Sequence, residues 1–411
     1  MQPIELLTDV SGSPKRIGQL ILQPSPTSLA RPSMAFRYDD EWRVHGFALG
    51  ADLPLTSGIH YPTPNARGGA FGFVADHAPA SWVRTVCQKA DLNGLKHPFS
   101  ELAADVPDLW TAMTSRPGAF SSLYSTKWRG LWLGRNAALM PSDAPRSGDS
   151  RKPHRILARR LEALQTRPAQ DDFDFFWRYA AGTFSVPALY WSDDKGAQRS
   201  VRSLTVLDAL DPAMTAAVTA SLARACGVDV VPGECVGIGL YAALRIDRTF
   251  VGEPLFCLSA ASLLSPSPQR PTCVLDVVDI LNCAGARPRE DLEQLFRRVL
   301  FDALLGSSCT RPQAVWFTPD TDGWRLLPVD FVCPVLGPVG ASQSPLPLIS
   351  GKSAADPEAV VGVSRYFGIP SAKAKSLLME FRHALGYWKH HANSCGADFM
   401  TEMQLRRLFE K

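Results

Sequence analysis

Residues 288–306 read PREDLEQLFRRVLFDALLG and form the stretch with the strongest helical periodicity in the chain. Pro288 suits the first position of a helix, because an N–H at that position would have no partner within the helix. Apolar side chains then recur at intervals of three and four, which predicts a helix with one fully buried face. These side chains are Leu292, Leu295, Phe296, Val299, Leu300, Ala303 and Leu304. We therefore expect a core helix here, in a part of the chain that turns mainly helical after residue 257.

A hairpin and a second long helix follow the core helix. The segments 315–318 and 324–327 are apolar and aromatic, and the sequence Asp-Thr-Asp-Gly at 320–323 predicts a tight turn between them. After Ser371, apolar residues recur at helical spacing as far as Trp388. The pattern therefore predicts a two-stranded hairpin between two long helices.

The segment before the core helix combines strands with one well-marked helix. Asp211 can cap this helix, Pro212 suits its first position, and Gly227 can supply a left-handed end. Strands are predicted at 186–191, 200–207 and 237–246. The larger part of the chain, 146–411, thus divides into a mixed part at 146–250 and a mainly helical part at 251–411.

A linker separates this larger part from an N-terminal unit at 1–145. Pro, Gly and Ser gather at residues 141–153 (PSDAPRSGDSRKP), a composition typical of connecting segments. Within the N-terminal unit we predict short strands at 34–38 and 47–49. Helical segments are predicted after Ser81 and near Leu109.

Composition and charge exclude several classes of protein. The 411 residues are 45% hydrophobic and 20% charged, and no stretch approaches the roughly 18 apolar residues that cross a bilayer. The first ten residues lack the basic and apolar pattern of a secretory signal, so we expect a cytoplasmic protein without membrane association. With 43 basic and 40 acidic residues, the whole surface is too balanced for a nucleic-acid-binding footprint. The nine cysteines form no CxxC pair, which favours free thiols.

Common catalytic and nucleotide-binding motifs are absent or incomplete. The chain contains neither GxSxG nor HExxH. Gly351-Lys352-Ser353 resembles the end of a phosphate-binding loop, but Leu346 stands where the first glycine is needed. Gly237-Ile238-Gly239 lacks the third glycine of a dinucleotide site, since Ala242 occupies that place. Function must therefore be sought in the order of landmarks along the chain.

Seven landmarks follow one another in a recognisable order. They are WRVHGFALGADLPL (42–55), FGFVADHAPASWVR (71–84), LRIDR (244–248), LSAASLL (258–264), DLEQLFRRVLFDALLG (291–306), GWRLLPVDFVCP (323–334) and a last helix with GYW (386–388). This succession resembles the HipA family of bacterial toxin kinases, the kinase halves of type II toxin–antitoxin modules, from about residue 36 to the end.

The resemblance implies a fold, an activity and a partner. It implies an α+β, two-lobed, protein-kinase-like fold with an N-terminal α/β subdomain, a mixed N-lobe and a mainly helical C-lobe. It also implies ATP- and Mg²⁺-dependent phosphorylation of Ser or Thr, and neutralisation by a small helix-turn-helix antitoxin. Phosphoryl transfer needs a phosphate cradle with a lysine, an acid that orients the nucleophile, and ligands for Mg²⁺.

The catalytic loop of the family departs from its pattern in this chain. Where the family has Asn-x-Asp-Asp-His-x-x-Asn after its long helix, residues 307–314 read SSCTRPQA. Cys309 matches the catalytic Asp, and a thiol with a pKa near ~8.5 is a poor substitute for a carboxylate and a poor Mg²⁺ ligand. Ala314 matches the metal-binding Asn and has no ligand atom in its side chain.

The second metal position and the phosphate loop also depart from the family pattern. Where the family has Leu-x-Pro-x-Tyr-Asp, Phe331 takes the place of the metal-binding Asp, and Asp330 stands one residue early as the only candidate carboxylate. A slip of one residue along a strand turns a side chain to the opposite face, although a bulge near the strand end can reverse this. The phosphate loop matches 181–187 (AGTFSVP), where Gly182 and Ser185 are the remaining candidates. Arg202 is at best the counterpart of the lysine, and its broad fork is a poor replacement.

These losses favour a HipA-like pseudokinase that acts by binding proteins and needs no cofactor. Its expected partners are a HipA-type kinase homologue or the helix-turn-helix antitoxin, with DNA reached only indirectly. One alternative is a divergent but active Ser/Thr kinase that uses ATP, Mg²⁺ and Asp330. A second alternative is a nucleic-acid-associated regulator that uses the basic residues of 151–160, which include Arg159 and Arg160.

Overall fold

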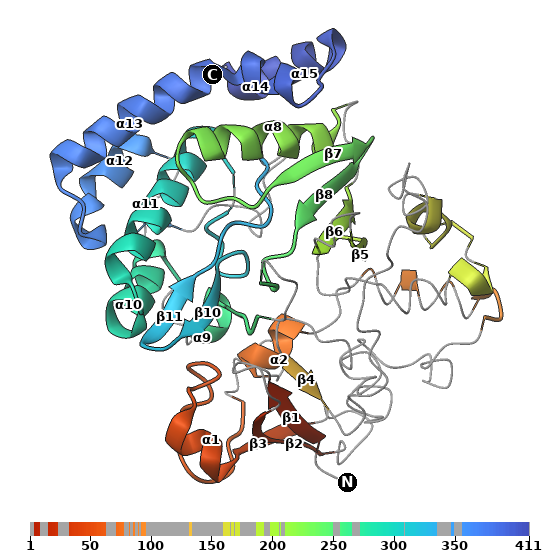
Figure 1. Cartoon of the computed structure of the whole chain (residues 1–411), viewed down its shortest axis with the longest axis vertical. Coiled ribbons are helices and arrows are strands. Elements are labelled where there is room, and N and C mark those ends of the chain that lie inside the picture. The colour runs from red at the N-terminus through yellow and green to blue at the C-terminus, as the bar shows by residue number, and fades with distance from the viewer. Residues whose placement is uncertain are drawn as a thin grey trace. The chain divides into compact units, whose positions relative to one another are not determined.

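The computed structural model divides the chain into two compact units, 1–201 with 247–258, and 202–246 with 259–411. Figure 1 labels their elements. The predicted boundary near residue 145 lies outside the described residues. The structure describes residues 4–8, 15–23, 33–62, 71–77, 82, 85–86, 89, 92–95, 131–133, 159–164, 166–167, 169–172, 186–192, 198–204, 206, 210–249, 255–264, 272–307, 309–334, 347–348 and 356–410.

The first unit contains an antiparallel sheet with the strand order β3-β2-β1-β4. Its strands are β1 (Ile4–Thr8), β2 (Lys15–Gln23), β3 (Ser33–Tyr38) and β4 (Leu131–Leu133). The predicted strand at 34–38 is confirmed as β3. Buried rings of Phe36, Phe71 and Phe73 pack against one another beneath the sheet, with centroids 5.7–6.3 Å apart. These rings form the core of the unit.

Short helices and two further strands complete the described part of the first unit. They are α1 (Asp40–His45), α2 (Gly72–His77), β5 (Ala188–Ser192) and β6 (Gln198–Ser203), and the boundary between the units falls inside β6. Asp39 caps α1 by accepting a hydrogen bond from the backbone N–H of Glu41 (3.1 Å). Residues 159–164 are helical, and position 109, near which a helix is predicted, lies outside the described residues.

The strand predicted at 47–49 is wrong, because these residues form a loop. Side chains, rather than a neighbouring strand, form hydrogen bonds with the backbone groups of this loop. The indole N–H of Trp42 donates to the carbonyl of Phe47 (3.0 Å), and the backbone N–H of Leu49 donates to the hydroxyl of Tyr38 (2.9 Å). The Tyr38 hydroxyl in turn donates to the carbonyl of Leu53 (2.8 Å).

The second unit begins with a helix on a hairpin. Helix α8 (Pro212–Ala225) packs against the antiparallel strands β7 (Gly233–Gly237) and β8 (Leu240–Leu244), as Figure 1 shows. Asp211 caps α8 by accepting from the N–H of Ala213 (2.9 Å), as predicted. Gly227 has φ +69°, the left-handed conformation expected just beyond the helix end.

Helices dominate the rest of the second unit, and α11 lies among them. Helix α11 packs against α10 and α12. The described helices are α9 (Ala260–Leu263), α10 (Val274–Ala284), α11 (Pro288–Leu305), α12 (Pro357–Gly362), the 3₁₀ turn η4 (Ser364–Phe367), α13 (Ser371–Gly386), α14 (Trp388–Ser394) and α15 (Phe399–Phe409). The predicted core helix is confirmed, and it ends at Gly306 in the left-handed conformation.

The predicted hairpin is also confirmed. Strand β10 (Trp316–Asp320) pairs with β11 (Gly323–Leu326) across the predicted turn, and Phe317 lies opposite Leu326. The two-residue strand β9 (Leu258–Ser259) follows β10 in the strand order β11-β10-β9. Within the described part of the chain, no helix is long and apolar enough to span a membrane.

Candidate functional site

A buried ion pair joins two residues of the second unit that lie 128 positions apart in the sequence. Arg202, on β6, donates from Nη2 to Oδ2 of Asp330 at 2.7 Å. Their side chains are only 5% and 12% exposed. The guanidinium also lies over the ring of Phe331, with Cζ 5.2 Å from the ring centroid. Arg202 is therefore held by both residues of the Asp330-Phe331 pair.

The backbone directly before Asp330 is fixed by the segment after α8. The N–H of Val329 donates to the carbonyl of Asp229 (2.9 Å), and the N–H of Val231 donates to the carbonyl of Val329 (3.0 Å). This parallel bridge lies directly before Asp330. The one-residue displacement seen in the sequence therefore leaves Asp330 facing Arg202 instead of turning it away.

Aromatic and apolar groups exclude water around the ion pair. Tyr241, on β8, is fully buried, and its ring meets Phe331 edge-on at 5.4 Å. Burial raises the pKa of the Tyr241 phenol to about 12, against smaller opposing effects of Arg202 and Arg224. Burial also raises the pKa of the Cys333 thiol to about 12. The chain's own side chains thus fill the surroundings of Asp330.

The loop after α11 is organised by Asp302, a fully buried carboxylate. Its Oδ1 accepts hydrogen bonds from the Ser307 hydroxyl and from the N–H of Cys309 (3.1 Å). Its Oδ2 accepts from the N–H and the hydroxyl of Thr310, at 2.9 and 2.6 Å. The sequence analysis missed this role, although one buried-face Asp followed by Ser and Thr hydroxyls is a signal for it. Asp302 therefore accepts the hydrogen bonds that these N–H and hydroxyl groups of the loop would otherwise donate elsewhere.

Cys309, which the sequence resemblance aligned with a catalytic Asp, points into this network. Cys309 is only 1% exposed, and its Sγ lies 3.0 Å from Oδ1 of Asp302. Burial, and then the Asp302 carboxylate, raise the pKa of the Cys309 thiol well above its ordinary value. A protonated, buried thiol is neither a base nor a nucleophile. Ala314, at the metal-binding Asn position, contributes only its backbone, through an N–H bonded to the carbonyl of Arg311 (2.8 Å).

Helix α11 is fastened to the strand that leads to Asp330. Arg298 is 1% exposed, and its Nη2 donates to the carbonyl of Leu327 at 2.6 Å. Burial lowers the pKa of Arg298, and the carboxylates of Asp229, Asp291 and Asp302 oppose that effect. Asp291 also accepts from the backbone N–H of Leu326 (3.1 Å). These bonds fix the position of Asp330 relative to α11.

Most of the other predicted site residues lie outside the residues that the structure describes. Gly182 and Ser185 lie outside them, as do residues 151–158 of the basic segment and the segment 351–353. Arg160 is ion-paired with Asp172. No cluster of three metal-ligating side chains occurs in the described ranges. Asp330 is held by Arg202 and Ala314 has no ligand atom, so these positions do not fit an Mg²⁺ ion bound between two oxygen ligands. The eight described cysteines are free thiols, as predicted.

Comparison with known proteins identifies the fold. No family model and no curated protein matches the sequence. The structure is similar to that of HipA in a complex of HipA, HipB and operator DNA from a toxin–antitoxin system of Shewanella oneidensis MR-1, with a TM-score of 0.60 and 12% sequence identity. The match covers 99% of this chain and 95% of that one. The protein therefore has the α+β, HipA-like fold that the order of landmarks predicted.

Proposed function

We propose that this chain is a HipA-like pseudokinase of a bacterial toxin–antitoxin type system and acts in the cytoplasm by binding proteins rather than by transferring phosphate. The observation that carries the proposal is the buried ion pair between Arg202 and Asp330. It joins Arg202, at best the counterpart of the phosphate-binding lysine, to Asp330, the candidate carboxylate one residue before the expected metal position.

The ion pair opposes nucleotide binding for an energetic reason. A kinase uses its lysine to hold phosphate and a carboxylate to hold Mg²⁺. Here Asp330 must first release Arg202 before it can bind a metal. Breaking a buried pair costs about 3–5 kcal/mol, because it leaves charges without compensation. The guanidinium fork of Arg202 is also a poor match for the place of a compact ammonium.

The catalytic loop supports the same proposal. The carboxylate that would orient the nucleophile is replaced by Cys309, whose thiol is buried against Asp302. The loop nevertheless keeps its order through hydrogen bonds to Asp302. A scaffold that stays ordered without catalytic groups suits a protein that acts through its surface.

The proposed partners follow from the similar structure. That structure contains HipB and operator DNA together with HipA. We propose that this chain binds a helix-turn-helix antitoxin or a HipA-type kinase homologue, and that it reaches DNA only through such a partner.

A thermal-shift titration with ATP, with and without Mg²⁺, tests the proposal. A ligand that binds only the folded state stabilises it by about 2.7 kcal/mol at one hundred times its Kd. We expect no shift at millimolar ATP in either condition. A saturable shift that requires Mg²⁺ would contradict the pseudokinase proposal.

The second candidate function is a divergent Ser/Thr kinase that uses ATP, Mg²⁺ and Asp330. The orientation of Asp330 favours it, because this carboxylate faces the Arg202 position. Such a kinase must open the ion pair when the nucleotide binds. It predicts a Mg²⁺-dependent thermal shift in the titration above, and a loss of that shift in Asp330→Ala.

A further inference from the structure

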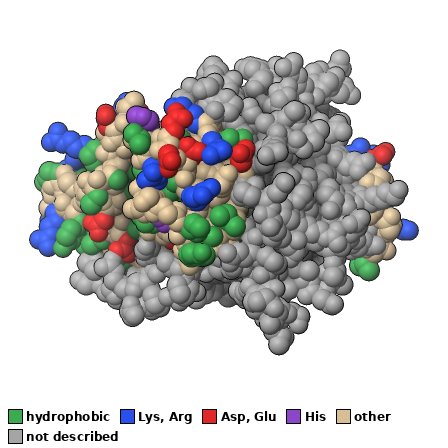
Figure 2. All heavy atoms as spheres, turned by 90° about the horizontal axis from the view of Figure 1, so that it is seen from below, with side chains coloured by type: hydrophobic (Ala, Val, Ile, Leu, Met, Phe, Trp, Pro, Cys, Tyr) green, Lys and Arg blue, Asp and Glu red, His purple; other side chains and the backbone are tan. Residues whose placement is uncertain are grey.

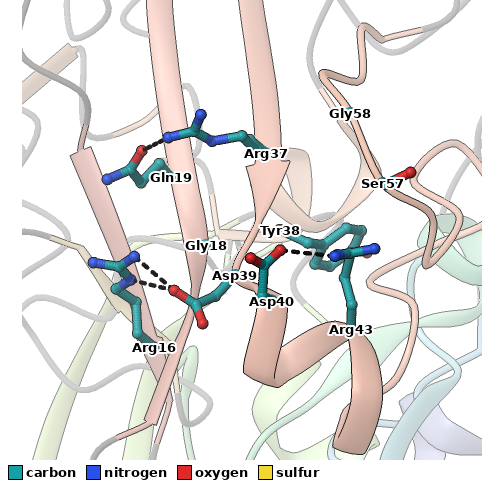
Figure 3. Close-up of a pocket in the computed structure, with 10 residues that line it drawn as sticks. All are labelled: Arg16, Gly18, Gln19, Arg37, Tyr38, Asp39, Asp40, Arg43, Ser57 and Gly58. Carbon is teal, nitrogen blue, oxygen red and sulfur yellow. Dashed lines mark hydrogen bonds and ion pairs between the residues drawn. The ribbon is translucent and has the colours of Figure 1, made fainter.

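The first unit contains a cavity of about 290 Å³ on the polar side of its sheet. Figure 3 shows side chains from β2, β3 and α1 around it, together with the loop at 57–58. The lining residues are Arg16, Gly18, Gln19, Arg37, Tyr38, Asp39, Asp40, Arg43, Ser57 and Gly58. This cavity is independent of the proposed pseudokinase site, because all of its residues belong to the first unit.

Two of the three arginines that line the cavity are paired with carboxylates. Arg16 binds Oδ2 of Asp39 through Nη2 (2.6 Å) and Oε1 of Glu5 through Nη1 (3.3 Å). Arg43 binds Oδ1 of Asp40 at 2.7 Å. These pairs consume the two acidic groups of the lining, so neither Asp39 nor Asp40 is left to neutralise the third arginine.

Arg37 is that third arginine, and its described hydrogen bond goes to a neutral group. Its Nη2 donates to Oε1 of Gln19 at 2.9 Å, across the β2–β3 pair in which the two residues lie opposite each other. A guanidinium has five N–H donors, and this bond uses one of them. Figure 3 shows the Arg37 side chain extending over the strands toward Gln19. Arg37 is therefore a cation whose described partner carries no charge.

We propose that this cavity binds a carboxylate monoanion, with Arg37 as its anchor. Asp39 and Glu5 offset Arg16, and Asp40 offsets Arg43, so Arg37 is the one arginine of the lining whose described partner is not a carboxylate. A bound carboxylate can pair with this guanidinium, because its two oxygens match the planar fork. A phosphate dianion leaves an excess negative charge beside Asp40, whose side chain is 92% exposed. Charges of both signs also intermingle on the face drawn in Figure 2, which gives no single-sign field for a polyanion.

The size of the cavity limits what can enter. Its volume lies at the lower end of the roughly 300–1,000 Å³ typical of pockets for drug-sized ligands. A carboxylate group with a few attached atoms fits, either as a free small acid or as a Glu or Asp side chain of a peptide. The backbone of β3 at Phe36 already pairs with His60, through hydrogen bonds of 2.9 and 2.8 Å, so a peptide would reach the cavity by a side chain rather than by strand pairing.

The test is a titration of the full, ¹⁵N-labelled chain followed by NMR at constant ionic strength. The probes are acetate, inorganic phosphate and the capped peptide acetyl-Gly-Glu-Gly-amide. We expect saturable shifts confined to the cavity residues for acetate and peptide, and at least about tenfold weaker binding in Arg37→Gln, since a charge-assisted hydrogen bond is lost. Arg37→Lys should give an intermediate affinity, because it keeps the charge and loses the fork. The matched control is Arg407→Gln, an exposed arginine on α15, which should bind as the wild type does.

Each outcome decides the proposal. Tighter binding of the peptide than of acetate assigns the carboxylate to a protein partner, and equal binding assigns it to a free acid. Phosphate binding as tight as acetate overturns the monoanion assignment. Unchanged affinity in Arg37→Gln overturns the anchor, and the absence of saturable shifts with all three probes overturns the site.

Discussion

Asp302 and Asp330 are both buried carboxylates of the second unit, but they are compensated in different ways. Asp302 accepts hydrogen bonds from a loop that begins only five residues later. Asp330 is compensated by a cation on a distant strand. The first arrangement orders a loop through hydrogen bonds between residues that are close in the sequence. The second places a charged partner where, under the proposed function, a metal or a nucleotide would have to compete.

The largest effect is expected when the Asp302 carboxylate is removed. Asp302→Ala leaves the N–H groups of Cys309 and Thr310 and two hydroxyls buried without acceptors. Each such group costs about 1–3 kcal/mol, so we expect unfolding free energy to fall by roughly 3–5 kcal/mol. Urea denaturation measures this change. Asp322→Ala, in the exposed hairpin turn, should lie within about 0.5 kcal/mol of the wild type. Equal losses in both variants would show that Asp302 has no special role.

The second prediction concerns the ion pair. Arg202→Met leaves Asp330 buried beside an apolar side chain, and we expect a loss of roughly 3 kcal/mol in urea denaturation. The double variant Arg202→Met/Asp330→Leu should recover most of that loss, because it removes both charges together. Additive losses in the double variant would mean that the two residues do not compensate each other.

The third prediction concerns the thiol beside Asp302. In the native protein at pH 8, iodoacetamide should modify the exposed Cys283 and spare Cys309, whose pKa is raised by burial. Peptide mapping by mass spectrometry locates the modified thiols. Addition of urea should make Cys309 reactive. Rapid alkylation of Cys309 in the native protein would contradict its burial.

The smallest effect is expected for the exposed ion pair between Glu293, on α11, and Lys373, on α13. A hydrogen bond from Lys373, and a second from Arg297, lower the pKa of Glu293 below its ordinary value. The pair therefore stabilises the fold above pH about 4.5, and this contribution is lost as the pH falls through the lowered pKa. Its exposure limits the contribution to about 0.5 kcal/mol. In Glu293→Gln, the decrease in unfolding free energy between neutral and acid pH should be smaller by that amount. Glu402→Gln should leave this decrease unchanged. Urea denaturation at several pH values measures it.

Local signals in the sequence predicted much of the fold. Asp211, Pro212 and Gly227 marked both ends of α8, and periodicity marked α11. The loop at 47–49 was missed because the Tyr38 hydroxyl, eleven residues from Leu49, takes a backbone group there. No local pattern relates such a side chain to the loop that it binds.

The sequence could indicate only single positions of the candidate site. The resemblance predicts replacements at Cys309, Ala314 and Phe331, and this remains a prediction. The pairing of Arg202 with Asp330 depends on tertiary structure across 128 residues, so no spacing rule could indicate it. The Asp302 network is close in sequence, but its burial depends on packing around α11.

The proposed pseudokinase function depends on the Arg202–Asp330 ion pair. It is tested most directly by incorporation of the γ-phosphate of ATP, with Mg²⁺, by the wild-type chain and by Asp330→Asn in the presence of a generic protein substrate. The pseudokinase account predicts the same background incorporation in both. Incorporation by the wild type that is lost in Asp330→Asn would contradict it.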